Sequence, residues 1–178
     1  IQVNGKDVRL EGGQALIDYT AFEQALLASL QLTATDTVRY NRFIGRLGMA
    51  STDTALLRNE LQQLIAFLEK RYAINAVDVP YGNGRLDAFG QIFNAIAVEA
   101  LQLPENTRVP DAPTSFPVLW DASHMDVVQW NGSAPNMEPG PLFQNATTAL
   151  AVYGKVSVDV HERFYPSSIR LDNLGGIQ

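Results

Sequence analysis

The sequence predicts a mainly α fold, an irregular helical domain with a long loop rich in proline and tryptophan and a short β-hairpin. Apolar residues recur at helical spacing in four stretches between residues 20 and 101, which predicts four amphipathic helices. From residue 103 to residue 141 no period is sustained, and this stretch contains most of the prolines and both tryptophans. With 178 residues, 46% of them hydrophobic, the chain has the size of a single domain or domain fragment. We divide it into a helical part, 1–102, and a part with the tryptophan loop, 103–178.

The first predicted elements are a hairpin and a helix. Residues 1–12 alternate weakly between apolar and polar side chains and contain Asn4-Gly5, a pair typical of two-residue hairpin turns. A helix is predicted from Thr20 to Leu30, because Thr20 and Glu23 have the spacing of a capping box. Its apolar stripe consists of Phe22, Leu26, Leu27 and Leu30.

The second and third helices have clear boundaries in the sequence. The second is predicted from Asp36 to Leu47, and Gly48 is expected to end it. Its inward residues are expected to be Val38, Phe43, Ile44 and Leu47, and its outward residues Arg39, Arg42 and Arg46. The third helix is predicted to begin after a capping residue within 51–53 and to run to Tyr72. Its apolar face comprises Leu56, Leu57, Leu61, Leu64, Ile65 and Leu68.

The fourth helix is expected to lie at the centre of the fold. It is predicted over residues 85–101 and has apolar residues on more than one face, so we expect burial on two sides. A shorter helix is predicted to begin at Pro141 or Leu142 and to end at Tyr153. Valines at 156, 158 and 160 then alternate with polar residues, which predicts an extended segment. Residues 165–178 are predicted to form a turn and coil.

The charge and the lack of cysteine exclude several classes of protein. A formal charge of -6 and a pI near 4.8 argue against a nucleic-acid partner, because such proteins cluster Lys and Arg on one surface. No apolar window approaches the roughly 20 residues of a membrane span, so no span is predicted. The absence of cysteine rules out disulfides, thiolate metal ligands and the C-x-x-C-H attachment of c-type haem within this chain.

Few side chains have the spacing of a catalytic or metal site. His124 and His161 are far apart, and neither has a second His or Cys at the spacing of a zinc site. Both fit ordinary surface or hydrogen-bonded histidines, although His124 could relay protons beside a redox centre. No serine lies in a Gly-x-Ser-x-Gly elbow, and the glycines at 82 and 84 lack the Lys-Ser/Thr ending of a P-loop.

The loop from Pro117 to Ser133 is the most unusual stretch of the sequence. It contains Trp120 and Trp130, and an indole is costly in a loop unless its apolar face is covered and its N–H has a partner. Two interpretations stay open. Either both indoles plug the loop onto the helical core, or they pack on a cofactor or a partner domain.

Several motifs occur together around this loop. They are Gly84-Arg85-Leu86-Asp87-Ala88-Phe89-Gly90 with Asn94, Phe116-Pro117-Val118-Leu119-Trp120-Asp121, Asp126-Val127-Val128-Gln129-Trp130-Asn131-Gly132-Ser133, Pro141-Leu142 with Asn145, Val152-Tyr153-Gly154, and Ser167-Ser168-Ile169-Arg170-Leu171-Asp172-Asn173-Leu174. Together they resemble a family of bacterial dihaem c-type cytochromes, which includes dihaem cytochrome c peroxidases and rubber-cleaving dihaem oxygenases. The resemblance covers roughly residues 20 to 174 and corresponds to the region between the two haem-attachment motifs.

The resemblance implies that this segment lines a haem pocket. Phe89, Ile92 and Phe93 would supply apolar walls that exclude water and raise the reduction potential. Arg85 would pair with a haem propionate, and the alternative is that it pairs with Asp87 or lies free in solvent. The cofactor-contacting residues implied in this way are Arg85, Phe89, Phe93, Trp130, Asn131 and Asn145.

The resemblance also implies roles close to the reacting iron. Trp120 and Trp130 would stack near the porphyrin edge or relay electrons between the two haems. Either His124 or Phe143 would lie over the open iron face. The candidate catalytic residues are therefore Trp120, His124 and Phe143, and no metal ligand is assigned to this chain.

The chain departs from the family because it contains neither C-x-x-C-H motif. We expect a pocket-forming fragment of a periplasmic or secreted dihaem oxidoreductase, peroxidase- or oxygenase-like, that is inactive alone. The expected partners are the rest of the polypeptide, which would carry haem c, and an electron donor. Its apolar haem-facing surface would favour self-association. The alternative is a haem-free interaction or small-ligand-binding module that uses the tryptophan loop.

Overall fold

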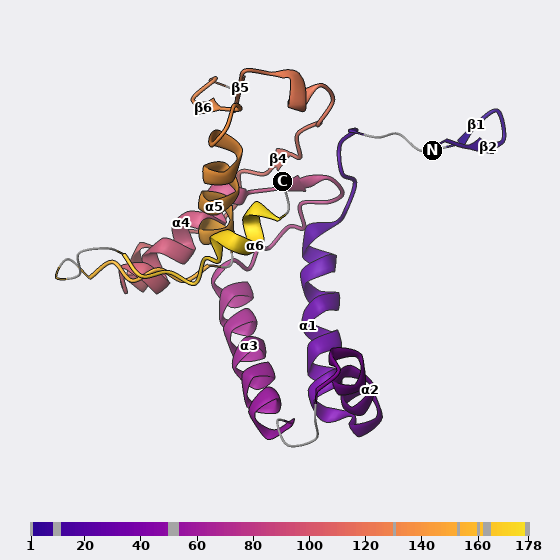
Figure 1. Ribbon diagram of the computed structural model, residues 1–178, viewed down its shortest axis with the longest axis vertical. Coiled ribbons are helices and arrows are strands. Elements are labelled where there is room, and N and C mark those ends of the chain that lie inside the picture. Colours follow the sequence, from indigo (N-terminus) through magenta and orange to yellow (C-terminus); the bar gives the residue numbers. More distant parts are fainter. Residues whose placement is uncertain are drawn as a thin grey trace.

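The computed structural model describes residues 2–8, 12–49, 54–129, 131–152, 154–159, 161 and 165–176, and this part of the chain is mainly α, as predicted (Figure 1). The helices are α1 (Tyr19–Thr35), α2 (Thr37–Leu47), α3 (Thr54–Ile74), α4 (Ala88–Ala95), α5 (Gly140–Val152) and α6 (Leu171–Gly175). Shorter helical turns are the π-helical η2 (Ile96–Ala100) and the 3-10 turns η3 (Pro104–Asn106) and η4 (Ala122–His124). Antiparallel pairs are formed by β1 (Gln2–Val3) with β2 (Lys6–Asp7), β3 (Arg85–Leu86) with β4 (Thr114–Ser115), and β5 (Val127–Val128) with β6 (Ala134–Pro135).

The predicted N-terminal hairpin is confirmed. β1 pairs with β2 so that Val3 lies opposite Lys6, and the two residues between them form the turn. Asn4 and Gly5 have φ angles of 51° and 73°, the left-handed conformation that a two-residue hairpin turn requires. Figure 1 shows this hairpin set apart from the helices.

The helices α1, α2 and α3 form what we call the helical arm. α1 and α3 lie side by side, and α2 packs on α1 at the end away from α4 and α5 (Figure 1). The predicted capping box at Thr20 and Glu23 is wrong, because Asp18 caps α1 instead. Its side chain accepts a hydrogen bond of 3.0 Å from the backbone N–H of Ala21. α1 therefore begins earlier than predicted, and it continues to Thr35 rather than ending at Leu30.

Asp36 both ends α1 and begins α2. Its backbone N–H donates to the carbonyl of Leu32 at 2.9 Å. Its carboxylate accepts from the backbone N–H groups of Val38 and Arg39 at 2.8 and 3.0 Å. These hydrogen bonds lower the pKa of Asp36 below its ordinary value, and the bond from Arg39 has the largest effect. Gly48 ends α2 with φ 65°, so both predicted boundaries of this helix are confirmed.

The predicted burial of α2 is only partly correct. The arginines at 39, 42 and 46 are exposed, as expected. Val38 was expected to face inward but is 79% exposed, and Leu47 is also exposed. The reason is that α2 packs mainly on α1, and α1 covers only a narrow stripe of the α2 surface.

α3 supplies most of the interior of the arm. Leu61 and Leu68 are 5% and 4% exposed, and Tyr40 of α2 is 3% exposed. Tyr40 donates a hydrogen bond to the carbonyl of Thr54, which ties α2 to the start of α3. Leu56 and Leu64, expected on the same apolar face, remain exposed because the rest of the arm covers only part of α3. The predicted capping residue within 51–53 lies outside the described residues.

α4 begins three residues later than predicted. Arg85 and Leu86 form β3, whose partners in β4 lie almost thirty residues further along the chain. Asp87 then caps α4, because its carboxylate accepts from the backbone N–H of Gly90 at 2.9 Å and from that of Ala112 at 3.0 Å. Beyond Ala95 the helix widens into the π turn η2, in which Leu101 N–H donates to the carbonyl of Ile96.

The burial of α4 differs between its two sides. On the covered side, Asn94 is 3% exposed and donates to the carbonyls of Ile74 at 3.2 Å and Arg108 at 2.7 Å. Phe89 and Phe93, by contrast, are 68% and 65% exposed. The expectation that this helix is buried on two sides is therefore wrong, because the rest of the described chain packs on one side of it.

The C-terminal part agrees with the sequence in its main helix only. α5 begins at Gly140, next to the predicted start, while the predicted last residue, Tyr153, lies outside the described residues. In the predicted extended segment, Val156 forms an isolated bridge with Ser167, and Val160 lies outside the described residues. α6 occupies a stretch for which coil was predicted, since a single turn of helix is too short to show a period in the sequence.

The molecule exposes an unusually large surface. Its accessible area is 13040 Å², whereas a compact monomer of the same mass exposes about 8,500 Å². Much of the excess is apolar, because many large hydrophobic side chains are more than a third exposed. No helix in the described parts of the chain combines the length and the apolarity that crossing a bilayer requires.

Candidate functional site

The helices α4 and α5 carry three exposed aromatic rings, two of which are neighbours on α4. Figure 1 shows the two helices side by side, and residues of one contact residues of the other. Phe89 and Phe93 lie one turn apart on α4, with ring centroids 6.5 Å apart and planes inclined by 31°. Phe143 lies in the first turn of α5 and is 63% exposed. Burying one such ring stabilises by about 1.5–3 kcal/mol, so this pair of helices is suited to contact another apolar surface.

Arg85 lies in β3, directly before the cap of α4. Its guanidinium donates to the carbonyl of Pro113 at 3.4 Å and lines a cavity of about 550 Å³. Asp78 and Asp111 line the same cavity. The alternative pairing of Arg85 with Asp87 is not present, because the Asp87 carboxylate binds backbone N–H groups instead.

The tryptophan loop packs on the segment that precedes α1. Leu119 N–H donates to the carbonyl of Gly12 at 2.7 Å. A Cβ atom at Gly12 would lie 2.6 Å from Cδ1 of Trp120, so the indole and this backbone are in close contact. Trp120 is nevertheless 55% exposed. One part of its ring is covered by protein and another part is open to a partner, while Trp130 lies outside the described residues.

His124 and Asn131 belong to turns of the same loop. His124 ends η4, is exposed, and donates its backbone N–H to the carbonyl of Asp121 at 2.9 Å. Asn136 holds this turn by donating to the carbonyls of Ala122 and Met125 at 2.7 and 2.8 Å. The carboxamide oxygen of Asn131 accepts from Ser133 N–H at 3.1 Å and so stabilises its own turn.

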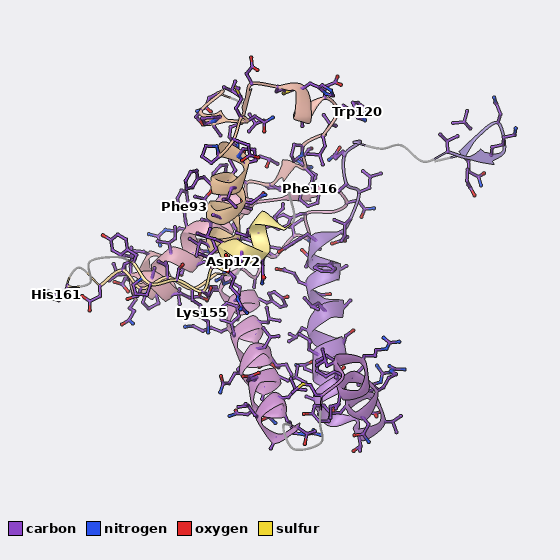
Figure 2. The ribbon with its side chains drawn as sticks, in the orientation of Figure 1. Phe93, Phe116, Trp120, Lys155, His161 and Asp172 are labelled. Atoms are coloured by element: carbon purple, nitrogen blue, oxygen red, sulfur yellow. The ribbon has the colours of Figure 1, made fainter. Side chains whose placement is uncertain are left out.

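The predicted site residues fall into two groups. Arg85, Phe89 and Phe93 belong to β3 and α4, which contacts the helix that carries Phe143 and Asn145. The second group is Trp120, His124 and Asn131 in the loop. Figure 2 shows Trp120 and Phe93 well separated, so these two residues do not contact each other. A flat ligand or a second protein surface would be needed to connect the groups.

One ionisable residue was not recognised in the sequence. Glu23 lines a cavity of about 190 Å³ between α1 and the end of α3, together with Tyr72 and Tyr81. Burial raises the pKa of Glu23 to about 7, although a hydrogen bond with Tyr19 and the charge of Arg71 act in the opposite direction. In the sequence, the spacing of Glu23 from Thr20 suggests a capping residue, and no sequence pattern indicates that Glu23 lines a cavity.

The chain has few groups that could hold a metal ion. Within its described residues, no three side chains of His, Cys, Asp or Glu are grouped closely enough to bind one.

The sequence is similar to an uncharacterized protein, y4iJ, of Sinorhizobium fredii. The two are 30% identical over 184 aligned positions, which cover 98% of this chain and 30% of the relative. The chain thus spans about 30% of the length of that relative. No protein-family model matches the chain, and neither does any solved structure.

Proposed function

We propose that this chain is the pocket-forming segment of a dihaem c-type cytochrome oxidoreductase, peroxidase- or oxygenase-like, that is periplasmic or secreted. Haem c would be attached through C-x-x-C-H motifs elsewhere in the same polypeptide. The observation that carries the proposal is the exposed aromatic surface of α4 and α5, defined by Phe89, Phe93 and Phe143. These residues lie within the segment over which the sequence resembles the dihaem cytochromes.

The chemistry of this surface fits a porphyrin. A porphyrin is flat and apolar and carries two carboxylates, so it is complementary to aromatic rings with a guanidinium nearby. Arg85 lies three residues before α4, on the strand that leads into the helix carrying Phe89 and Phe93. The Asp87 carboxylate accepts hydrogen bonds from the backbone N–H groups of Gly90 and Ala112. These bonds fix the start of the helix and therefore the positions of its side chains.

The residues of this chain would shape the pocket, while the haem iron would supply the reactivity toward peroxide or dioxygen. Phe89, Phe93 and Phe143 would exclude water, which raises the reduction potential of a buried redox centre. Trp120 would offer its open indole surface to the porphyrin edge or to electron transfer. His124 would hold or pass a proton, a role that imidazole side chains often have in enzymes.

The proposal is tested by expressing the complete reading frame in a periplasmic host with c-type haem maturation. We expect covalently bound haem, detected by its Soret absorption and by a pyridine haemochrome assay. In that protein the double variant Phe89→Asp, Phe93→Asp should lower the reduction potential and the turnover of peroxide or dioxygen. The matched control is Leu56→Asp on α3, a residue 63% exposed that lies outside this surface and should change neither quantity.

Two results would contradict the proposal. One is a reading frame without C-x-x-C-H on either side of this segment. The other is a folded, colourless protein from the maturation host, which would favour a haem-free module that binds through the tryptophan loop.

The chain of 178 residues should also self-associate through the α4–α5 surface, so gel filtration at several concentrations should show larger species that the Phe89→Asp, Phe93→Asp variant lacks.

A further inference from the structure

A third cavity lies between the C-terminal half of α3, the π turn η2 and the segment that follows α5. Its volume is about 440 Å³, which is within the range of small-molecule sites. Its apolar lining consists of Phe67, Ile96, Val98, Leu150 and Val156. None of the residues in the α4–α5 aromatic surface or in the tryptophan loop contributes to it, so this cavity is independent of the function proposed above.

The cavity concentrates positive charge in an acidic protein. The chain has a net charge of -6 and three lysines, Lys6, Lys70 and Lys155. Two of these lysines, Lys70 and Lys155, line the cavity together with Arg71. Phe67, Lys70 and Arg71 share one face of α3, because residues three and four apart are neighbours on a helix. The cavity therefore has the opposite charge to the rest of the chain.

The one carboxylate in the lining is already paired. Glu99 accepts from Nε of Arg71 at 3.2 Å and from its Nη2 at 2.8 Å, a bidentate contact that uses both carboxylate oxygens. Glu99 belongs to η2, and the wider π turn alters the direction in which helical side chains emerge. Arg71 is thereby neutralised, and its side chain is only 6% exposed.

The two lysines keep their charge available. Within the described chain, no carboxylate oxygen lies within 4 Å of the ammonium group of Lys70 or Lys155. The ammonium of Lys155 is 5.2 Å from the ring centroid of Phe67, and the guanidinium of Arg71 is 5.3 Å from the same centroid. Arg71 and Lys155 thus lie around the same phenyl ring, and among the described residues Glu99 is the single carboxylate that lines the cavity with them. The excess of positive charge favours the binding of an additional anion in the cavity.

We propose that this cavity binds a small amphipathic carboxylate. The ammonium groups of Lys70 and Lys155 hold the carboxylate, and Ile96, Val98 and Leu150 contact its apolar body. A neutral ligand of the same shape would gain only the apolar contacts. An amphipathic cation would meet repulsion from both lysines.

Titration calorimetry on the 178-residue protein tests the proposal with three probes of equal chain length: octanoate, octan-1-ol and octylammonium. We expect octanoate to bind about tenfold more tightly than octan-1-ol, and octylammonium more weakly than either. Lys70→Gln and Lys155→Gln should each weaken octanoate binding about threefold and leave octan-1-ol unchanged. Lys6→Gln removes the same charge from the hairpin and is the matched control, so it should have no effect.

Amine labelling followed by mass spectrometry gives a second readout in the unmodified protein. Octanoate should slow the labelling of Lys70 and Lys155, while Lys6 reacts at the same rate with and without the ligand. Equal affinities for octanoate and octan-1-ol, or equal protection of all three lysines, would overturn the proposal. Both lysine substitutions are at exposed side chains, and circular dichroism checks that the variants remain folded.

Discussion

The helical arm and the region that we call the head (α4, η2, α5 and α6) both depend on amphipathic helices, but they cover their apolar residues to different degrees. In the arm, Leu61 and Leu68 of α3 are almost fully buried between consecutive helices. In the head, Phe89, Phe93 and Phe143 are more than 60% exposed. The arm provides its own interior, whereas the head presents large rings that the described chain leaves uncovered.

The arrangement of the exposed residues separates the two regions further. The arm also exposes apolar side chains, such as Val38 of α2 and Leu56 and Leu64 of α3, but these are aliphatic, and exposed aliphatic residues are ordinary on a protein surface. Phe89 and Phe93 are neighbours one turn apart, and α5 with Phe143 packs beside their helix. Two neighbouring exposed rings on one helix, with a third exposed ring on the helix packed beside it, are typical of a binding site rather than of the solvated side of a helix.

The largest effect is expected for a substitution inside the arm. Leu68→Ala should lower the free energy of unfolding by about 3 kcal/mol, because it removes buried methyl groups and leaves a cavity. Leu56→Ala is the same change at a residue 63% exposed, and it should cost less than about 1 kcal/mol. Urea denaturation followed by circular dichroism measures both values. Equal losses in the two variants would show that the arm does not have the interior described above.

A smaller effect is expected where the arm meets the head. Arg71 of α3 and Glu99 of η2 form the ion pair that joins them, and both side chains are largely buried. Arg71→Met should lower the free energy of unfolding by about 2 kcal/mol, because Glu99 would be left without its partner. Adding Glu99→Gln should restore part of this loss. In a double-mutant cycle, strictly additive values would mean that the pair does not couple the two regions.

The smallest effect is expected at Glu23, and it depends on pH. The pKa of Glu23 is raised from 4.5 to about 7 in the folded chain, so the folded state binds its proton more tightly than the unfolded state does. The contribution of Glu23 to stability is therefore largest below about pH 4.5, falls as the pH rises, and is lost above about pH 7. The full shift corresponds to about 3 kcal/mol, but Glu23 is only half-buried and water screens it, so we expect about 1 kcal/mol.

Glu23→Gln removes this dependence. The variant should be about 1 kcal/mol more stable than the parent at pH 8 and equally stable at pH 4. Glu60→Gln, at an exposed residue of α3, is the control and should change stability little at either pH. Thermal unfolding at the two pH values measures the difference. If both variants gained the same stability at pH 8, the gain would come from the change in net charge and not from the cavity around Glu23.

The sequence predicts elements well where their signals are local. The hairpin turn at Asn4-Gly5 and both boundaries of α2 follow from one or two residues each, and the structure confirms them. The start of α4 was wrong because β3 forms only through pairing with β4, far along the chain. A single-sequence pattern contains no information on such distant partners. The same limit explains why α4 was expected to be buried on two sides, although Phe89 and Phe93 are exposed.

The candidate site is less predictable than the fold. The sequence identified aromatic residues on α4 and in the loop, but not that Trp120 and Phe93 lie apart. The close contact of Trp120 with Gly12 joins segments more than a hundred residues apart, which no spacing rule foresees. The cavity with Lys70 and Lys155 was missed for the same reason, because its lining comes from α3, the α4–η2 helix, α5 and the segment that follows α5.

The double role of Asp36 restricts how the arm can vary. One backbone N–H and one carboxylate at this position fix the end of α1 and the beginning of α2, without an intervening linker. An inserted or deleted residue there would rotate α2 about its axis by roughly 100° relative to α1. The residues of α2 that pack on α1 would then face solvent. We therefore expect insertions and deletions among relatives to occur elsewhere than at the junction of α1 and α2.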